Sequence, residues 1–324
     1  MRLMTILIAG ALGQTSSAAA QSSTDLTNAI LDADAPDCAA YSGDYHSDVT
    51  DLGRDLAFEG AVTITAEPDV CTFAVNQIPN HDFGGVRWPR EAAANTEVLQ
   101  IPRNPQFADE PVTTGFMPTA ILLNGVKWES DPAACFAEGS SDPGQERVGC
   151  NPRDLDHPWR YNVGNPLNGF SFDAYHAHVQ NGGLYHYHGT PRVLYSSEGQ
   201  LFDDAACAAA GPSPVIGFAF DGFPLYGPCI TDADGTVRAA RSSYVIKSGE
   251  RQEVTGYETP FVAGVVETSS YNGQFVGDFA YVAGAGDLDE CNGRMVDGTY
   301  GYYVTQGFPY AMRCFSGTPI IPSR

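Results

Sequence analysis

The chain has 324 residues, with 39 acidic against 17 basic side chains and a net charge of −22 at neutral pH. A surface this acidic repels phosphate groups, so the composition argues against nucleic acid as a partner. No stretch reaches the roughly 20 apolar residues that a membrane-spanning helix needs, so the sequence predicts no membrane span.

The first twenty residues have the pattern of a secretory signal peptide. Arg2 precedes an apolar run from Leu3 to Leu12, and Ala18-Ala19-Ala20 offers small residues for cleavage before Gln21. Such a leader is removed during export. We therefore predict a signal peptide over residues 1–20 and a mature protein that is periplasmic or secreted.

The remaining chain predicts a β-rich unit made of short strands. Residues 21–60 are predicted as a lead-in, and residues 61–324 as a single domain. The 35 glycines and 22 prolines divide the chain into short segments with long loops between them. This pattern favours a mainly β fold, either an antiparallel β-sandwich or an irregular barrel. The predicted strands are 61–66, 70–76, two around the Asn-Gly turn in 120–128, 215–220, 244–247, 278–282 and 299–305, and a short helix is predicted in 203–210.

Eight cysteines follow the predicted signal peptide, an even number that indicates disulfides in an exported chain. The sequence does not fix their pairing. Proximity favours Cys135 with Cys150, Cys207 with Cys229 and Cys291 with Cys314, which leaves Cys38 with Cys71. Cysteine ligation of a metal is the competing interpretation, but no Cys-x-x-Cys spacing supports it.

Four of the seven histidines lie between residues 176 and 188. They form two His-x-His pairs around Asn181-Gly182-Gly183, which is typical hairpin-turn chemistry. Since side chains alternate along a strand, His176 and His178 share one face, and His186 and His188 share one face of the next strand. A hairpin closed about Gly182 places His178 opposite His186 and His176 opposite His188, close enough for four imidazoles to converge on a metal.

Two alternatives remain open for this hairpin. The histidines form a structural hydrogen-bond cluster, or they gather on the surface without a role. A register slip or bulge of one residue would split the quartet between two faces. Tyr185 and Tyr187 are predicted to point to the face opposite the histidines.

Two further residues are candidates for the chemistry. His81 lies in a predicted loop, where site residues are over-represented. Asp221 follows a predicted strand in Phe220-Asp221-Gly222, and an ordinary turn is the competing interpretation. We predict catalytic roles for both, His81 as a further ligand or proton carrier and Asp221 as the group that orients a ring N–H.

Residues 185–189, Tyr-His-Tyr-His-Gly, resemble the signature of a bacterial family named for its YHYH motif. Other segments resemble further blocks of that family, and together they span roughly residues 70–320. These segments are Asn76 to His81, Leu123 to Val126, Gly217 to Pro228, Leu288 to Arg294, Phe308 to Tyr310 and Cys314 to Pro319.

The chain departs from the family pattern at two positions. Gln77 stands where the resemblance leads us to expect glycine, and Gly301 stands where relatives often carry histidine. The resemblance implies export and one shared domain. It also strengthens the expectation that His81 and Asp221 join the histidine hairpin.

The leading hypothesis is an exported metalloprotein with His176, His178, His186 and His188 as metal ligands. Copper suits an imidazole-only site best, which favours an oxidase or oxygenase, and zinc is the alternative. Zinc would favour a hydrolase with an open position for water and Asp221 or Glu290 as base. A non-catalytic copper-binding or scavenging protein is the third hypothesis. A metal ion is the predicted partner, and the substrate is not specified.

Overall fold

The computed structural model describes residues 23–86, 88–114, 118–136, 150, 157–196, 202–296 and 298–322. The predicted signal peptide lies outside these residues. Within them, strands dominate and the only α-helix is a short one, so the prediction of a mainly β fold is confirmed. No described helix is long and apolar enough to cross a membrane.

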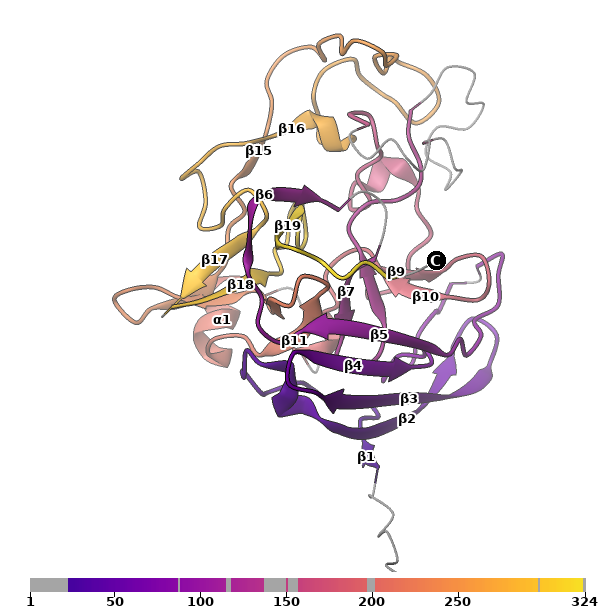
Figure 1. Ribbon diagram of the computed structural model, residues 1–324. Coiled ribbons are helices and arrows are strands. Elements are labelled where there is room, and N and C mark those ends of the chain that lie inside the picture. Colours follow the sequence, from indigo (N-terminus) through magenta and orange to yellow (C-terminus); the bar gives the residue numbers. More distant parts are fainter. Residues whose placement is uncertain are drawn as a thin grey trace, which may run out of the picture.

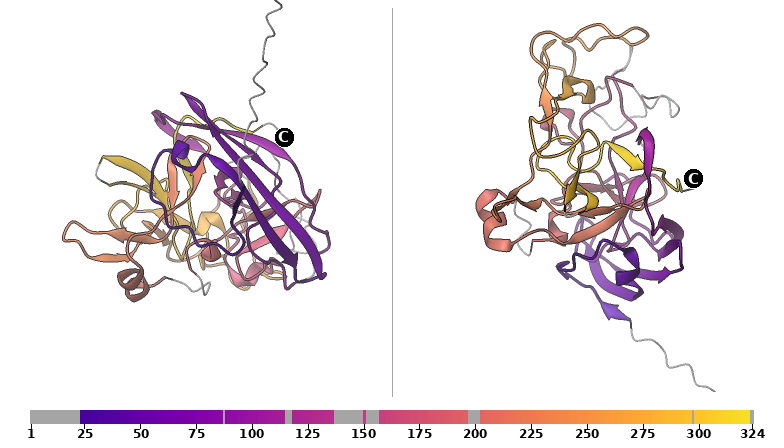
Figure 2. Two further views of the ribbon diagram at one scale, coloured as in Figure 1. Left: turned by 90° about the horizontal axis from the view of Figure 1, so that it is seen from below. Right: turned by 60° about the vertical axis from the view of Figure 1, so that its left-hand side comes forward.

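The N-terminal sheet has five strands in the order β1-β2-β3-β4-β5. All its neighbours are antiparallel except β1 and β2. In Figure 1 strands β2 to β5 form a layer at the bottom, and in Figure 2 they lie on an outer side of the molecule. The bounds are β1 Thr24–Asp25, β2 Gly43–Asp51, β3 Leu56–Ala66, β4 Val70–Val75 and β5 Glu97–Pro102.

Strand structure begins earlier than the sequence indicated. The predicted strands at 61–66 and 70–76 are present in β3 and β4, but β2 begins at Gly43 and β3 at Leu56. The alternation in β2 is hard to recognise because its buried positions include Ser47 and Asp51, which are polar. Asp51 is satisfied by local hydrogen bonds, among them one from the amide of Gly53 at 2.9 Å.

The second sheet has eight strands in the order β17-β18-β12-β11-β7-β8-β10-β9. It is mixed, because β8 and β10 run parallel, as do β12 and β18. The predicted Asn-Gly turn joins β7 to β8, with Gly125 at φ 80°. The bounds are β7 Pro118–Leu122, β8 Lys127–Glu129, β9 Ala177–Val179, β10 Tyr185–Tyr187, β11 Val215–Ala219, β12 Pro224–Tyr226, β17 Gly293–Val296 and β18 Thr299–Tyr303.

One hydrophobic core joins the two large sheets. Phe73 and Ile101 from the N-terminal sheet belong to the same buried cluster as Ile121 and Phe218 from the eight-stranded sheet. Gly125 shows how close the two sheets lie, since a Cβ there would meet Cγ2 of Val62 at 2.5 Å. The described strands therefore form open sheets around a shared core. The expectation of purely antiparallel pairing needs correction, and no described sheet closes on itself as the irregular barrel would require.

Short elements complete the fold around these sheets. Two-stranded pairs form between β13 and β14, between β15 and β16, and between β6 and β19. The predicted helix is present as α1, Asp204–Ala210, with the Asp203 side chain capping its N-terminus. The other bounds are β6 Phe107–Thr113, β13 Cys229–Thr231, β14 Val237–Ala239, β15 Tyr244–Ile246, β16 Phe279–Tyr281 and β19 Cys314–Gly317, with 3₁₀ turns at Cys38–Tyr41, Pro166–Asn168, Arg192–Leu194 and Val276–Asp278.

All eight cysteines form disulfides, in the pairing that proximity favoured. Cys38–Cys71 ties the first 3₁₀ turn to β4, and Cys207–Cys229 ties α1 to β13. With no free cysteine, the alternative of thiolate metal ligands is excluded for these residues.

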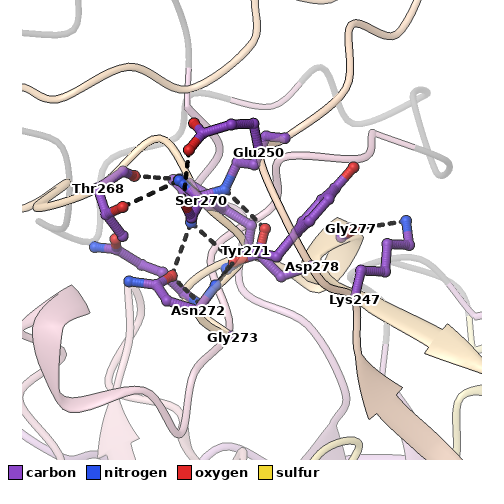
Figure 3. Close-up of polar contacts among 12 residues, drawn as sticks. Lys247, Glu250, Thr268, Ser270, Tyr271, Asn272, Gly273, Gly277 and Asp278 are labelled. Carbon is purple, nitrogen blue, oxygen red and sulfur yellow. Dashed lines mark hydrogen bonds and ion pairs between the residues drawn. The ribbon is translucent and has the colours of Figure 1, made fainter.

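A long excursion between β15 and β16 is organised by a buried ion pair. Arg251 donates to both carboxylate oxygens of Asp278 at 2.8 and 2.9 Å, and both side chains are fully buried. The same carboxylate accepts from the amides of Gln274 and Phe275. Figure 3 shows Asp278 in this cluster, with Lys247 reaching separately to the carbonyl of Gly277.

Candidate metal centre

The histidine hairpin has the register that its turn predicts. His178 in β9 is paired with His186 in β10, and the glycines at the turn, Gly182 and Gly183, have φ of 86° and 80°. A segment before β5 holds this turn in place. The carbonyl of Gly183 accepts from the amide of Ala93 at 2.9 Å, and that of Gly182 accepts from the Asn95 side chain at 3.1 Å.

Three of the four predicted ligands converge. Nε2 of His186 lies 3.0 Å from Nε2 of His178 and 3.0 Å from Nε2 of His188. All three residues are buried, and their nitrogens meet the distance requirement for a common metal ion. With metal–nitrogen bonds of about 2.0–2.1 Å, a tetrahedral ion separates its ligand nitrogens by about 3.3 Å, which is close to this spacing.

Backbone carbonyls set the tautomers of two of these rings. Nδ1 of His188 lies 3.0 Å from the carbonyl oxygen of Glu129, and Nδ1 of His186 lies 3.3 Å from that of Leu184. A carbonyl only accepts, so each Nδ1 carries the hydrogen and each Nε2 of a neutral ring presents a lone pair. The two lone pairs then face each other across 3.0 Å, an arrangement that a shared cation would stabilise.

Burial disfavours protonation of His178 and His188. Desolvation holds the pKa values of His178 and His188 well below the ordinary value, and proximity to His186 lowers them further. Phe172 contributes an apolar wall, with ring centroids 5.0 Å from His178 and 5.6 Å from His188. His178 and His188 are thus held in the neutral form in which histidine binds metals.

His176 lies outside the group of three. Its φ of 56° is left-handed, so its side chain leaves the alternation of the strand. Its ring instead lies near Thr190 Oγ1 at 3.3 Å and accepts from Arg192 at 3.2 Å. Its backbone still supports the centre, because its carbonyl accepts from the amide of His188 at 2.9 Å. Burial, with Arg192 nearby, lowers the pKa of His176 to about 4.

Glu129 joins the centre, although the sequence did not single it out. Strand β8 runs parallel to β10 with Lys127 opposite His186, and Glu129 follows two residues later on the same face. Its Oε2 lies 3.8 Å from Nε2 of His186, and its Oε1 accepts from Gln180 at 3.4 Å. The alternation of polar and apolar side chains in Lys127-Trp128-Glu129 can be seen in the sequence, but the pairing of β8 with β10 cannot.

His81 lies behind the hairpin. Tyr187 points to the face opposite the converging histidines, as predicted, and donates to Nε2 of His81 at 2.6 Å. Nδ1 of His81 donates to the carbonyl of Asp82 at 2.7 Å, so both ring nitrogens are hydrogen-bonded. Burial lowers its pKa to about 4. His81 is therefore not grouped with the metal-facing nitrogens, and its predicted catalytic role stays a prediction.

Asp221 lies farther from the centre, at the turn between β11 and β12. Strands β7 and β8 separate β11 from β10, a distance of about 14 Å across the sheet. Its carboxylate accepts from Tyr302 at 2.5 Å and from the amide of Gly317 at 2.9 Å, and burial raises its pKa to about 6. The amide of Phe223 also donates to this carboxylate at 3.3 Å. Within the described residues no histidine ring is among its hydrogen-bond partners, so its predicted role in orienting a ring stays a prediction.

A cavity of about 900 Å³ opens beside the histidines. His186 and His188 form part of its wall, and the end of β9 forms another part. Glu129 and Lys127 line it from β8, and Glu97 lines it from the start of β5. The candidate centre is therefore accessible to a molecule much larger than water.

In comparisons with known proteins, one family model matches the chain. The family model described as "YHYH protein" matches residues 98–317, which includes β8, the hairpin and Asp221. No curated protein and no solved structure shows significant similarity to the chain.

Proposed function

This chain belongs to the YHYH protein family, and we propose that it is a metal-dependent enzyme whose centre is formed by His178, His186 and His188. The observation that carries the proposal is the convergence of three buried Nε2 atoms, two of which are lone-pair donors facing each other across 3.0 Å. A purely structural hydrogen-bond cluster would place a donor between each pair.

The number of ligands favours catalysis over storage. A saturated site of four histidines would suit a scavenging protein, whereas His176 lies apart and three imidazoles leave a metal coordination position open. The cavity that His186 and His188 line gives a substrate access to that position.

Copper is the first candidate ion. The donor set consists of imidazoles, without thiolate, and imidazole suits copper and zinc, with copper the tighter binder. Copper would supply redox chemistry, so the reaction class we propose is that of an oxidase or oxygenase. The chain's own contribution is to fix the rings of His188 and His186 through the carbonyls of Glu129 and Leu184, and to favour the neutral form of His178 and His188 by burial.

A zinc-dependent hydrolase is the second candidate, and Glu129 is the observation that favours it. Its carboxylate lies on the cavity side of the centre, 3.8 Å from Nε2 of His186. Zinc would supply a bound water, and Glu129 would act as the base, a role for which the sequence analysis named Asp221 or Glu290.

We propose that the protein acts outside the cytoplasm, in the periplasm or after secretion. Four disulfides support this, since disulfides persist in oxidising compartments. The strongly acidic composition supports a partner other than nucleic acid.

Elemental analysis tests the proposal directly. Untagged protein isolated from the periplasm is compared with the His186→Ala, His188→Ala double variant and with His176→Asn as the matched control. Near-stoichiometric copper that disappears only in the double variant supports the first candidate and leads to oxygen-consumption assays. Zinc with the same dependence leads to hydrolysis assays. If neither ion binds, even after reconstitution, the metal centre is refuted.

A further inference from the structure

Side chains from three separate segments meet where the N-terminal sheet adjoins the eight-stranded sheet. Gln77 follows β4, Glu97 begins β5 and Lys127 begins β8. Nζ of Lys127 and Nε2 of Gln77 both donate to Oε2 of Glu97, each at 2.7 Å. Because one oxygen accepts both hydrogen bonds, the amine and the amide nitrogen lie within two hydrogen-bond lengths of each other.

These three side chains are largely withdrawn from water. Gln77 is 2% exposed and Lys127 is 7% exposed, and the Glu97 side chain, at 24%, is the most accessible of the three. All three form part of the wall of the cavity beside the histidines. Polar groups that are held together with little water around them interact more strongly than the same groups on an open surface.

Gln77 is held in a conformation that a glutamine rarely adopts. Its φ of 61° lies in the left-handed region, where glycine is favoured because it has no Cβ. Its Nε2 also donates to the carbonyl of Asn95 at 3.4 Å, but its Oε1 is buried without a hydrogen-bond partner. Backbone strain and an unpaired buried acceptor both lower stability, and strain of this kind is concentrated at functional sites.

A lysine, a side-chain amide and a carboxylate in contact are the groups from which an amide bond between two side chains can form. The carboxylate takes a proton from the ammonium group, which becomes a neutral amine and therefore a nucleophile. The carboxyl group then has a hydrogen to donate to the oxygen of the side-chain amide. A half-turn of the Gln77 amide about its last torsion exchanges Nε2 and Oε1, so the unpaired oxygen gains this donor on Glu97.

We propose that Lys127 and Gln77 become joined by an amide bond between Nζ and Cδ, with Glu97 as the residue that transfers the protons. The Nζ–Cδ bond forms, the Cδ–Nε2 bond breaks, and Nε2 leaves as ammonia with protons that Nζ gives up. Glu97 ends as the carboxylate that it was at the start. One ammonium and one primary amide thus become one secondary amide and one ammonium ion, without an oxidant or a further reactant.

This bond ties the segment after β4 to β8, and so links the N-terminal sheet covalently to a strand that pairs with the histidine hairpin. A covalent link between distant segments restricts the unfolded chain and stabilises the folded one, as a disulfide does. The inference goes beyond the proposed function, because it concerns a modification of the chain that forms with or without a bound metal.

Mass spectrometry of the denatured and reduced protein tests the proposal. The chain has two lysines, Lys127 and Lys247, so the amine of each can be followed separately. After acetylation of the denatured chain with acetic anhydride, Lys247 should be labelled and Lys127 should not. Proteolysis should release a branched fragment that joins the segments containing Gln77 and Lys127 and is lighter than their sum by one ammonia.

Three variants examine the role of each group. Lys127→Arg keeps the positive charge but has no amine, so the branched fragment should disappear, whereas the matched control Lys247→Arg should retain it. Gln77→Met removes the carbonyl carbon and should leave Lys127 fully labelled. Glu97→Gln should lower the joined fraction by roughly tenfold or more, because an amide does not transfer the protons. The wild-type measurement stands alone, so poor folding of a variant does not hide the answer.

The outcomes that contradict the proposal are distinct. Labelling of Lys127 in wild type as complete as that of Lys247 would overturn it. A branched fragment lighter by one water, with Lys127 joined to Glu97, would also overturn it because the bond is a different one. So would loss of ammonia at an asparagine or at an N-terminal glutamine while Lys127 is labelled. None of these measurements depends on metal content, so failure of the cross-link and failure of the proposed function are separate results.

Discussion

The hydroxyl of Tyr187 donates a 2.6 Å hydrogen bond to Nε2 of His81, on the face of β10 opposite the converging histidines. Asn124 donates to the same hydroxyl at 3.1 Å and to the side-chain oxygen of Asn80 at 3.2 Å. Segments that are distant in the sequence therefore meet behind the histidine hairpin and fix the strand that carries His186 and His188.

Tyr187→Phe should lower stability while leaving metal binding intact. The substitution leaves Nε2 of His81 buried without a donor, which costs about 1–3 kcal/mol. Urea unfolding measures this loss. Tyr175→Phe is the control, since that ring also contacts His81 but its hydroxyl makes no hydrogen bond within the described residues. Equal stability of the two variants would refute the role of the Tyr187 bond.

Substitution of His188 should weaken metal binding strongly, whereas substitution of His176 should leave it nearly unchanged. His188→Ala removes a converging nitrogen and should weaken binding by roughly 100-fold or more, equivalent to about 2.7 kcal/mol. His176→Asn should leave affinity within a few-fold, because asparagine tolerates the left-handed backbone and the ring lies outside the group. Competition with a chelator of known affinity measures both. Equal weakening would show that His176 is a ligand.

The pH dependence of stability should report on Asp221. Burial raises its pKa from 3.8 to about 6, so between these values the folded state holds a proton that the unfolded state has lost. The stability that protonation supplies is complete below about pH 4 and is lost as the pH rises through about 6. The total loss is about 3 kcal/mol.

Asp221→Asn should remove that part of the pH dependence, since the amide cannot ionise and its oxygen can still accept from Tyr302. Urea unfolding of both proteins at several values between pH 4 and pH 7 measures the difference in slope. Parallel curves would show that Asp221 does not titrate in this range.

The buried ion pair of Arg251 and Asp278 should contribute far more to the free energy of unfolding than an exposed ion pair does. Arg251→Met leaves the Asp278 carboxylate buried without its cation and should cost about 3–5 kcal/mol. Arg241→Met breaks a pair whose side chains are both more than half exposed and should cost less than about 1 kcal/mol. Thermal unfolding compares the variants, and proteolysis within residues 250–278 should accelerate only in the first.

Local patterns in the sequence predicted the hairpin well. The Asn-Gly-Gly turn fixed the register that pairs His178 with His186, and the alternation of β10 placed Tyr187 on the far face. Proximity along the chain also gave the disulfide pairing. These features depend on neighbours within a few residues or on loops that close easily.

Features that depend on distant contacts, or on an unusual backbone conformation at one residue, were missed. The left-handed backbone of His176 breaks the alternation that the four-ligand prediction assumed. Glu129 reaches the centre only because β8 pairs in parallel with β10, and neither strand carries a local signal for that pairing. Asp221 was expected beside the histidines, but two intervening strands keep it apart.

Ala93 and Asn95, which hydrogen-bond to the turn of the histidine hairpin, affect where the chain can be shortened without loosening that hairpin. The family model matches the chain from residue 98, after both of these residues. The matched segment therefore leaves out two residues that hold the turn of the histidine hairpin in place. A fragment cut to residues 98–317 would keep all three converging histidines but lose the support of their turn, so we expect it to hold the hairpin less firmly than the full chain does.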